Sequence, residues 1–251
     1  MPRDRTTTSY GASVRGPLHR SESAANQDAW MRASGRYGAL VVVCDGMGSR
    51  PNSHLGAKAA CTAVREAATI WAAAEDAPVQ LLAYLVEVIW RVRIHPLAPA
   101  EAATTCLLAL ARKDGVWIVG GVGDGLAIVK DGDAPVQRLT AERSAGFGNE
   151  TKALGASRGS RDWSLSELPA TSNSRTVVLT TDGIADDLIP ERLEEFFGWI
   201  VEDFRNDDPS TRWRRIAKDL QNWLTPKHLD DKTVAVLSVD AELVGRKGRP
   251  R

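Results

Sequence analysis

Residues 39–45 read ALVVVCD and residues 176–182 read TVVLTTD, and these two stretches decide the fold class. Each is a mainly apolar run that ends in an aspartate, and a glycine follows each aspartate. Because neither run alternates apolar with polar residues, each predicts a strand that is buried on both faces. Runs of the same kind lie at residues 106–111, 116–119, 126–129 and 233–239. Together they predict stacked sheets whose outer faces are covered by helices.

Helical patterns lie between these strands. Residues 53–75 place apolar side chains on one face, with Ser53 as a candidate N-cap, and residues 78–94 are apolar nearly all round. A third helical block spans residues 190–224. Residues 140–175 are rich in Gly, Ser and Asn and predict a long surface loop. This order of elements favours the α+β class over regular βαβ alternation.

The composition is that of an ordinary globular protein. The 251 residues are 43% hydrophobic and 25% charged, and 32 basic residues balance 32 acidic ones. These proportions exclude collagen-like, disordered and disulfide-scaffold proteins, and the balanced charge offers no general attraction to nucleic acid. We expect one domain over residues 1–251, with its core at about residues 10–240 and a disordered basic tail at 241–251.

The cysteines and the hydropathy pattern bear on location. The three cysteines have no CxxC spacing and each lies inside an apolar run, so we expect reduced core residues in a cytoplasmic protein: Cys44, Cys61 and Cys106. The first 20 residues hold no apolar segment, and charged residues interrupt the later apolar stretches. We therefore expect neither a signal peptide nor a membrane span.

Five Asp-Gly pairs occur, and the ordinary structure of such a pair is a turn. Asp114 and Asp131 join apolar runs at hairpin spacing and are predicted to be turns. Asp45 and Asp182 instead end fully apolar strands and precede a loop that leads to a helix, which suits a carboxylate that binds a cation. Asp124 fits either a hairpin turn or a cation site.

Asp230 and Asp231 stand at the start of the last predicted strand, where a charged strand end is the simpler explanation. Acidic sites at several strand ends, with no His or Cys cluster beside them, nevertheless indicate Mg²⁺ or Mn²⁺ rather than zinc. The glycines do not form a nucleotide-binding motif, because G-x-G-x-x-G and GK[ST] are both absent. The serine nucleophile motif G-x-S-x-G is absent as well.

Six motifs follow one another along the chain: NQDAW (26–30), VVVCDGMGS (41–49), ATTCLLAL (103–110), GGVGDG (120–125), LTTDGIADDL (179–188) and DDKTVAVL (230–237). In this order they resemble the metal-dependent protein phosphatases of type 2C, bacterial branch. The resemblance covers about residues 10–240. It implies a central β-sandwich of two mostly antiparallel sheets, flanked by helices on both sides, with a metal site at one end.

The resemblance also implies a ligand set and an activity. Two or three Mn²⁺ or Mg²⁺ ions would activate a water that attacks phosphoserine or phosphothreonine in a protein. Asp45 would bridge two ions, and Asp182 and Asp230 would complete one of them. The remaining implied metal positions are the Gly46 carbonyl, Asp124 as an outer ligand, and Asp28.

Three positions depart from the family pattern. Ser23 stands where relatives often carry a phosphate-binding Arg, so we expect Arg20, with His19 beside it, to bind the substrate phosphate. Gln27 stands where many relatives have Glu, so its contact with metal-bound water would be neutral. Met47 occupies a loop position where eukaryotic relatives have His, which leaves no obvious general acid.

The leading hypothesis is a serine/threonine phosphoprotein phosphatase, acting as a monomer on a phosphorylated protein, with a cognate kinase as the natural partner and with no nucleic acid or membrane involved. A catalytically weak phosphatase-like scaffold is the alternative from a different class. A hydrolase of small phosphate esters would share the same site. Retention of the strand-end aspartates favours an enzyme, because adjacent buried carboxylates repel one another without a cation.

Overall fold

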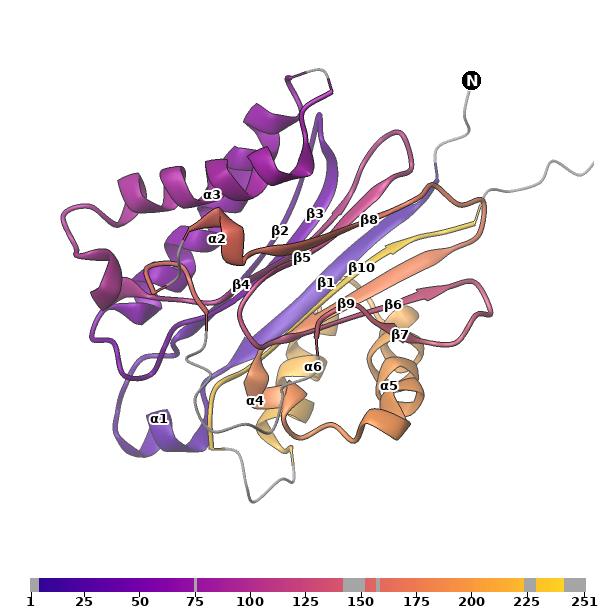
Figure 1. Ribbon diagram of the computed structural model, residues 1–251. Coiled ribbons are helices and arrows are strands. Elements are labelled where there is room, and N and C mark those ends of the chain that lie inside the picture. The colour runs from indigo at the N-terminus through magenta and orange to yellow at the C-terminus, as the bar shows by residue number, and fades with distance from the viewer. Residues whose placement is uncertain (1–4, 75, 142–151, 157–158, 224–228, 242–251) are drawn as a thin grey trace, which may run out of the picture.

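The computed structural model describes residues 5–74, 76–141, 152–156, 159–223 and 229–241. Two five-stranded sheets face each other in a sandwich (Figure 1), and every neighbouring strand pair is antiparallel. The first sheet has the strand order β1 (Thr7–Val14), β10 (Lys232–Val239), β9 (Arg175–Thr180), β6 (Leu126–Asp131), β7 (Gln137–Arg138). The second has the order β2 (Asp28–Gly35), β3 (Gly38–Asp45), β4 (Cys106–Ala111), β5 (Trp117–Val122), β8 (Ser164–Leu168).

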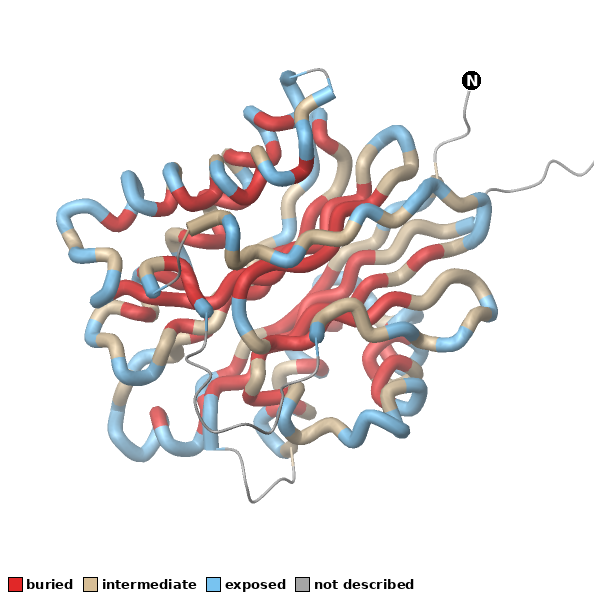
Figure 2. Tube along the Cα trace, viewed as in Figure 1, coloured by how far each residue is buried: buried red, intermediate tan, exposed pale blue. Residues whose placement is uncertain are grey.

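Helices cover both outer faces of the sandwich. Helices α2 (Ser53–Trp71) and α3 (Val79–Ile94) pack on the second sheet, and α5 (Leu193–Arg205) and α6 (Arg212–Gln221) pack on the first. Alternate residues of each central strand point into the layer between the sheets or into a helix layer. Figure 2 shows the resulting run of buried residues through the middle of the molecule. This four-layer packing explains why the central strands are apolar throughout, and it confirms the expected sandwich.

The shorter helices connect the layers. They are α1 (Pro17–Ser21), α4 (Asp182–Ala185) and the 3₁₀ turns at Pro99–Ala102, Ser160–Asp162 and Pro190–Arg192. Two details of the predicted helices are wrong. Helix α2 ends at Trp71 instead of continuing to residue 75, and Ser53 is its first residue, with Asn52 at the cap position and no side-chain cap.

The predicted loop at residues 140–175 is wrong in part. Strand β8 lies within it and pairs with β5 through Gly120 and Leu165, and Leu154 forms a bridge with Thr104. Strand β8, with the sequence SLSEL, is short and only partly buried, so it has no apolar run from which it could be predicted. Residues 142–151 and 157–158 of that loop and residues 242–251 of the predicted tail lie outside the described part of the chain.

The three cysteines are buried and form no disulfide bond, as expected. The Cys61 thiol donates a weak hydrogen bond to Cys44 Sγ at 3.7 Å. Among the described residues, no helix has the length and apolar character that crossing a membrane requires.

Candidate metal centre

Four of the strand-end aspartates meet at one end of the sandwich. Asp45 is the last residue of β3, Asp124 lies between β5 and β6, Asp182 opens α4 directly after β9, and Asp230 precedes β10. Antiparallel pairing brings the end of one strand beside the start of the next, so these positions converge. They line one cavity of about 160 Å³, together with Met47, Gly48, Ser49 and Thr105.

The backbone of Asp45 is fixed by two threonines. The Thr105 hydroxyl accepts the Asp45 N–H at 3.0 Å, and the Asp45 carbonyl accepts the Thr105 N–H at 2.7 Å and the Thr104 hydroxyl at 2.8 Å. The next residue, Gly46, donates its N–H to the Gln27 carbonyl at 3.1 Å. These contacts fix the backbone from which the Asp45 side chain reaches the cavity, where its carboxyl group shares a hydrogen bond with Asp182.

Asp28 lies behind the cavity rather than on its wall. It stands directly opposite Asp45 in the β2–β3 register, and it is buried. One of its carboxylate oxygens accepts hydrogen bonds from the hydroxyls of Thr181 (2.8 Å) and Thr233 (2.7 Å). Burial raises the pKa of Asp28 well above its usual range, against the effect of these hydroxyls. We call Asp28, Asp45, Asp124, Asp182 and Asp230 the aspartate cluster.

The electrostatics of the aspartate cluster favour a cation. Burial raises the pKa of Asp45 well above its usual range, and the charges of Asp28, Asp182 and Asp230 raise it further. Burial also raises the pKa of Asp182. Asp28 is buried, Asp45, Asp124 and Asp182 are partly buried, and Asp230 is exposed. A bound cation stabilises carboxylates that repel one another in such a site. The cavity wall offers oxygen donors and neither His nor Cys, which fits a hard divalent cation such as Mn²⁺ or Mg²⁺.

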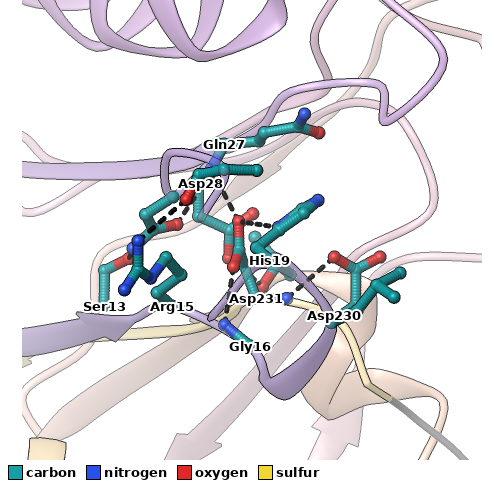
Figure 3. A network of polar contacts seen from close by, with 12 residues as sticks. Ser13, Arg15, Gly16, His19, Gln27, Asp28, Asp230 and Asp231 are labelled. Atoms are coloured by element: carbon teal, nitrogen blue, oxygen red, sulfur yellow. Dashed lines mark hydrogen bonds and ion pairs between the residues drawn. The ribbon is translucent and has the colours of Figure 1, made fainter. Parts of the chain in front are cut away.

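The two residues expected to bind phosphate lie in different environments. His19 is buried on α1, with its Nδ1 atom 2.9 Å from a carboxylate oxygen of Asp231 (Figure 3). Arg20, the next residue, is exposed and does not line the cavity. Ligand atoms of His19, Asp230 and Asp231 lie within 4.8 Å of one another, so His19 reaches the edge of the aspartate cluster. The sequence indicated only a charged strand end for Asp231, because its partners lie more than 200 residues away in the chain.

The two Asp-Gly pairs predicted to be turns are both turns. Arg112 donates its N–H to the Val116 carbonyl, and Asp114 accepts the Val116 N–H at 3.1 Å. Asp131 has a further role that the sequence did not reveal. Its carboxylate binds the buried Arg175 guanidinium through two hydrogen bonds of 2.6 and 2.7 Å.

Comparisons with known proteins agree with this architecture. The family model for protein phosphatase 2C matches residues 15–231. A bacterial serine phosphatase structure is similar, with 16% identity, a TM-score of 0.67 and coverage of 95% of this chain and 100% of that one. MsPP, a PPM Ser-Thr phosphatase from Mycobacterium smegmatis in complex with cacodylate, has 22% identity, a TM-score of 0.62 and coverage of 93% and 98%.

The catalytic domain of the serine threonine protein phosphatase PstP, in complex with two manganese ions, is also similar, with 18% identity, a TM-score of 0.60 and coverage of 94% and 100%. A search of curated protein sequences gave no match. Because the family model matches most of the chain, the chain belongs to the protein phosphatase 2C family. The resemblance inferred from the six motifs is thereby confirmed.

Proposed function

We propose that this protein hydrolyses phosphoserine and phosphothreonine in proteins, with Mn²⁺ or Mg²⁺ bound by the aspartate cluster. One observation carries the proposal: four aspartates line a single cavity at the end of the sandwich, and burial raises the pKa of two of them. Such a site is stable at neutral pH when cations neutralise it. PstP, a relative of the same fold, was solved with two manganese ions.

The residues divide into ligands and supporting groups. We assign Asp45 as the ligand shared by two ions, Asp182 and Asp230 as ligands of one of them, and the Gly46 carbonyl as a ligand of the other. Asp124, on the cavity wall, would hold an outer ion. Four aspartates on the wall of one cavity offer enough carboxylate oxygens for more than one ion.

Asp28 has a supporting role in this assignment. It lies behind Asp45 and away from the cavity wall, and its negative charge adds to the field of the aspartate cluster. The hydroxyls of Thr181 and Thr233 fix the orientation of its carboxylate. We propose that Asp28 contacts the ions through water.

Bound divalent ions would supply a more acidic water and neutralise the charge that develops on the phosphoryl oxygens. The protein positions the metal ligands and the groups that bind phosphate. Thr104 and Thr105 hold Asp45 in place, and His19 and Arg20 on α1 are the groups that we propose to meet the substrate phosphate. Met47 lines the cavity but has no proton to donate to the leaving serine oxygen.

Phosphate release from a panel of phosphoserine and phosphothreonine peptides tests the proposal, with Mn²⁺, Mg²⁺ or EDTA present. We expect hydrolysis that depends on the added metal, because an all-oxygen site binds these ions only moderately. Full activity after exhaustive dialysis against EDTA would refute the metal assignment. Hydrolysis of small phosphate esters without hydrolysis of any phosphopeptide would mean that the substrate is a small phosphate ester and not a phosphoprotein.

The remaining proposals concern context. We propose a single catalytic domain that acts as a monomer, with a phosphorylated cognate kinase as partner, as the family resemblance implies. We also propose a cytoplasmic location, which the three buried, unbonded cysteines support. Light scattering and cell fractionation test the oligomeric state and the location.

A further inference from the structure

Asp231 lies next to a proposed metal ligand but faces a different set of partners. Its side chain is 1% exposed. One carboxylate oxygen accepts the Gly16 N–H at 2.7 Å, and the other accepts the Gln27 N–H at 2.6 Å. The second oxygen also lies 2.9 Å from His19 Nδ1, outside the direction of an aligned N–H bond, so this is a close polar contact (Figure 3). A buried carboxylate with two short bonds to backbone N–H groups is a strong local constraint.

These contacts close the loop that carries His19. The loop follows β1, which ends at Val14, contains α1, and enters β2 after Gln27; Asp231 therefore binds near both of its ends, at Gly16 and Gln27. Gly16 also packs against the main chain of Asp230, where a Cβ atom would lie 2.3 Å from the Asp230 carbonyl oxygen. Leu18 donates its N–H to the Leu229 carbonyl at 3.0 Å. The loop is therefore attached to the segment that carries Asp230.

The same carboxylate reaches the other side of the aspartate cluster through Gln27. While the Gln27 N–H binds Asp231, the Gln27 carbonyl accepts the N–H of Gly46 at 3.1 Å. Gly46 directly follows Asp45, so the contact spans from the last strand to the end of β3. Asp231 thus sets the position of one loop relative to both metal-binding segments.

His19 lies on the loop that this arrangement holds, in contact with Asp231. It is 7% exposed, and a ring nitrogen lies within 4.8 Å of the Asp230 carboxylate. With Nδ1 against Asp231, the other ring nitrogen, Nε2, points away from that carboxylate in Figure 3. Both oxygens of Asp231 accept backbone N–H groups, so this carboxylate is tied to the two ends of the loop.

We propose that Asp231 is a positioning residue for the phosphatase reaction. Its carboxylate holds the loop from Gly16 to Gln27 so that His19 Nε2 is directed at the substrate phosphate beside Asp230. This inference rests on the proposed function, which places His19 among the phosphate contacts. Asp231 itself contacts neither the ions nor the phosphate. Its removal should therefore weaken phosphate binding much more than metal binding.

Asp231→Asn is the main test variant, because it keeps the shape and removes an acceptor from one of the two N–H groups. If Asp231→Asn does not fold, Asp231→Glu is used instead, because it keeps the negative charge but changes its position. Asp114→Asn is the matched control, since Asp114 is an exposed turn residue at the opposite end of β4. Calorimetry measures Mn²⁺ binding, and then the binding of inorganic phosphate to the Mn²⁺-loaded protein.

In Asp231→Asn we expect phosphate affinity to fall about 10- to 100-fold, as for the loss of a charge-assisted contact, while the Mn²⁺ affinity changes less than threefold. The KM for a phosphopeptide should rise more than kcat falls. His19→Ala should have a similar effect, and the double variant should lose little more than either single variant, because Asp231 acts through His19.

Unchanged phosphate affinity in Asp231→Asn, or additive losses in the double variant, would overturn the inference. An equal loss of Mn²⁺ affinity would also overturn it, since Asp231 would then act on the metal site. Phosphate binding is measured without turnover, so this result stands apart from the proposed function. That function fails by a different observation, namely a wild-type protein that hydrolyses no phosphopeptide.

Discussion

Asp45→Asn is the substitution for which the structure makes the sharpest prediction. Burial raises the pKa of Asp45, and the charges of Asp28, Asp182 and Asp230, together with a hydrogen bond shared with Asp182, raise it further. Two unit charges about 4–6 Å apart repel by about 3–4 kcal/mol at an effective dielectric constant near 20. Protonation within the aspartate cluster and solvent at the cavity mouth remove part of this energy. We therefore expect the metal-free variant to be more stable than the wild type by about 1–3 kcal/mol.

Thermal melting in EDTA at pH 7.5 measures this difference. For a chain of this size, 1 kcal/mol corresponds to about 2–4 °C, so the variant should melt about 2–12 °C higher. Mn²⁺ at 100 times its dissociation constant should stabilise the wild type by about 2.7 kcal/mol, and it should have little effect on the variant. The variant should also lose phosphopeptide turnover, because Asp45 is the residue that we propose as a ligand of both ions.

Two results would refute this reasoning. A variant that melts below the wild type in EDTA would mean that the carboxylate is stabilised by its surroundings. Equal stabilisation of both proteins by Mn²⁺ would mean that Asp45 is not a ligand. Asp114→Asn serves as the control, and we expect it to melt and turn over like the wild type, because Asn-Gly forms the same turn as Asp-Gly.

Arg20→Ala should raise the KM for a phosphopeptide about 10- to 100-fold if the guanidinium binds phosphate, and an unchanged KM would assign the role to His19 alone. Met47→His should narrow the preference for aryl over serine phosphates, since a general acid contributes about 10²–10⁴-fold for poor leaving groups; an unchanged rate ratio would contradict this. Asp131→Asn should lower stability by about 1–3 kcal/mol, measured by urea unfolding, because it leaves the buried Arg175 without its carboxylate; unchanged stability would show that the pair contributes nothing. The pKa values of Asp28, Asp45 and Asp182 are raised in the folded protein, so the metal-free protein takes up protons when it folds. Their contribution to the free energy of unfolding is therefore complete below a pH of about 4, the unfolded pKa, and is lost as the pH rises through the folded pKa values. In EDTA, the melting temperature should fall less between pH 4 and pH 8 in Asp45→Asn than in the wild type. An equal fall in both proteins would contradict the inference that Asp45 loses stability as the pH rises.

The sequence predicted the parts of the fold that are buried on both faces. Six apolar runs became β3, β4, β5, β6, β9 and β10, each within two or three residues of its predicted bounds. Strands β1 and β2 escaped detection because each forms the edge of a sheet and mixes exposed with buried positions. Edge strands of this kind have no continuous apolar run, and their alternation is irregular, so periodicity carries little signal.

The candidate site shows the same division. The aspartates at strand ends were predicted to gather, and four of them line one cavity. The partners of Asp231 and of Asp131 were not predicted, since they join residues far apart in the chain. Such contacts depend on the path of the backbone in space, which local patterns do not encode. Arg20 was chosen for its chemistry, whereas the structure buries its neighbour His19 beside the aspartate cluster.

The geometry of the site is also set from the opposite end of the sandwich. Asp28 faces Asp45 only because β2 and β3 pair in a register that begins at the Gly35–Gly38 hairpin. Gly38 has a φ of +115°, and a Cβ atom there would lie 1.9 Å from the Ala111 carbonyl oxygen, so this turn tolerates no other residue without moving. A slip of one residue would turn Asp28 to the other face of the sheet. Over strands of eight residues, about 25 Å long, a turn remote from the metal centre thus determines which carboxylates meet in it.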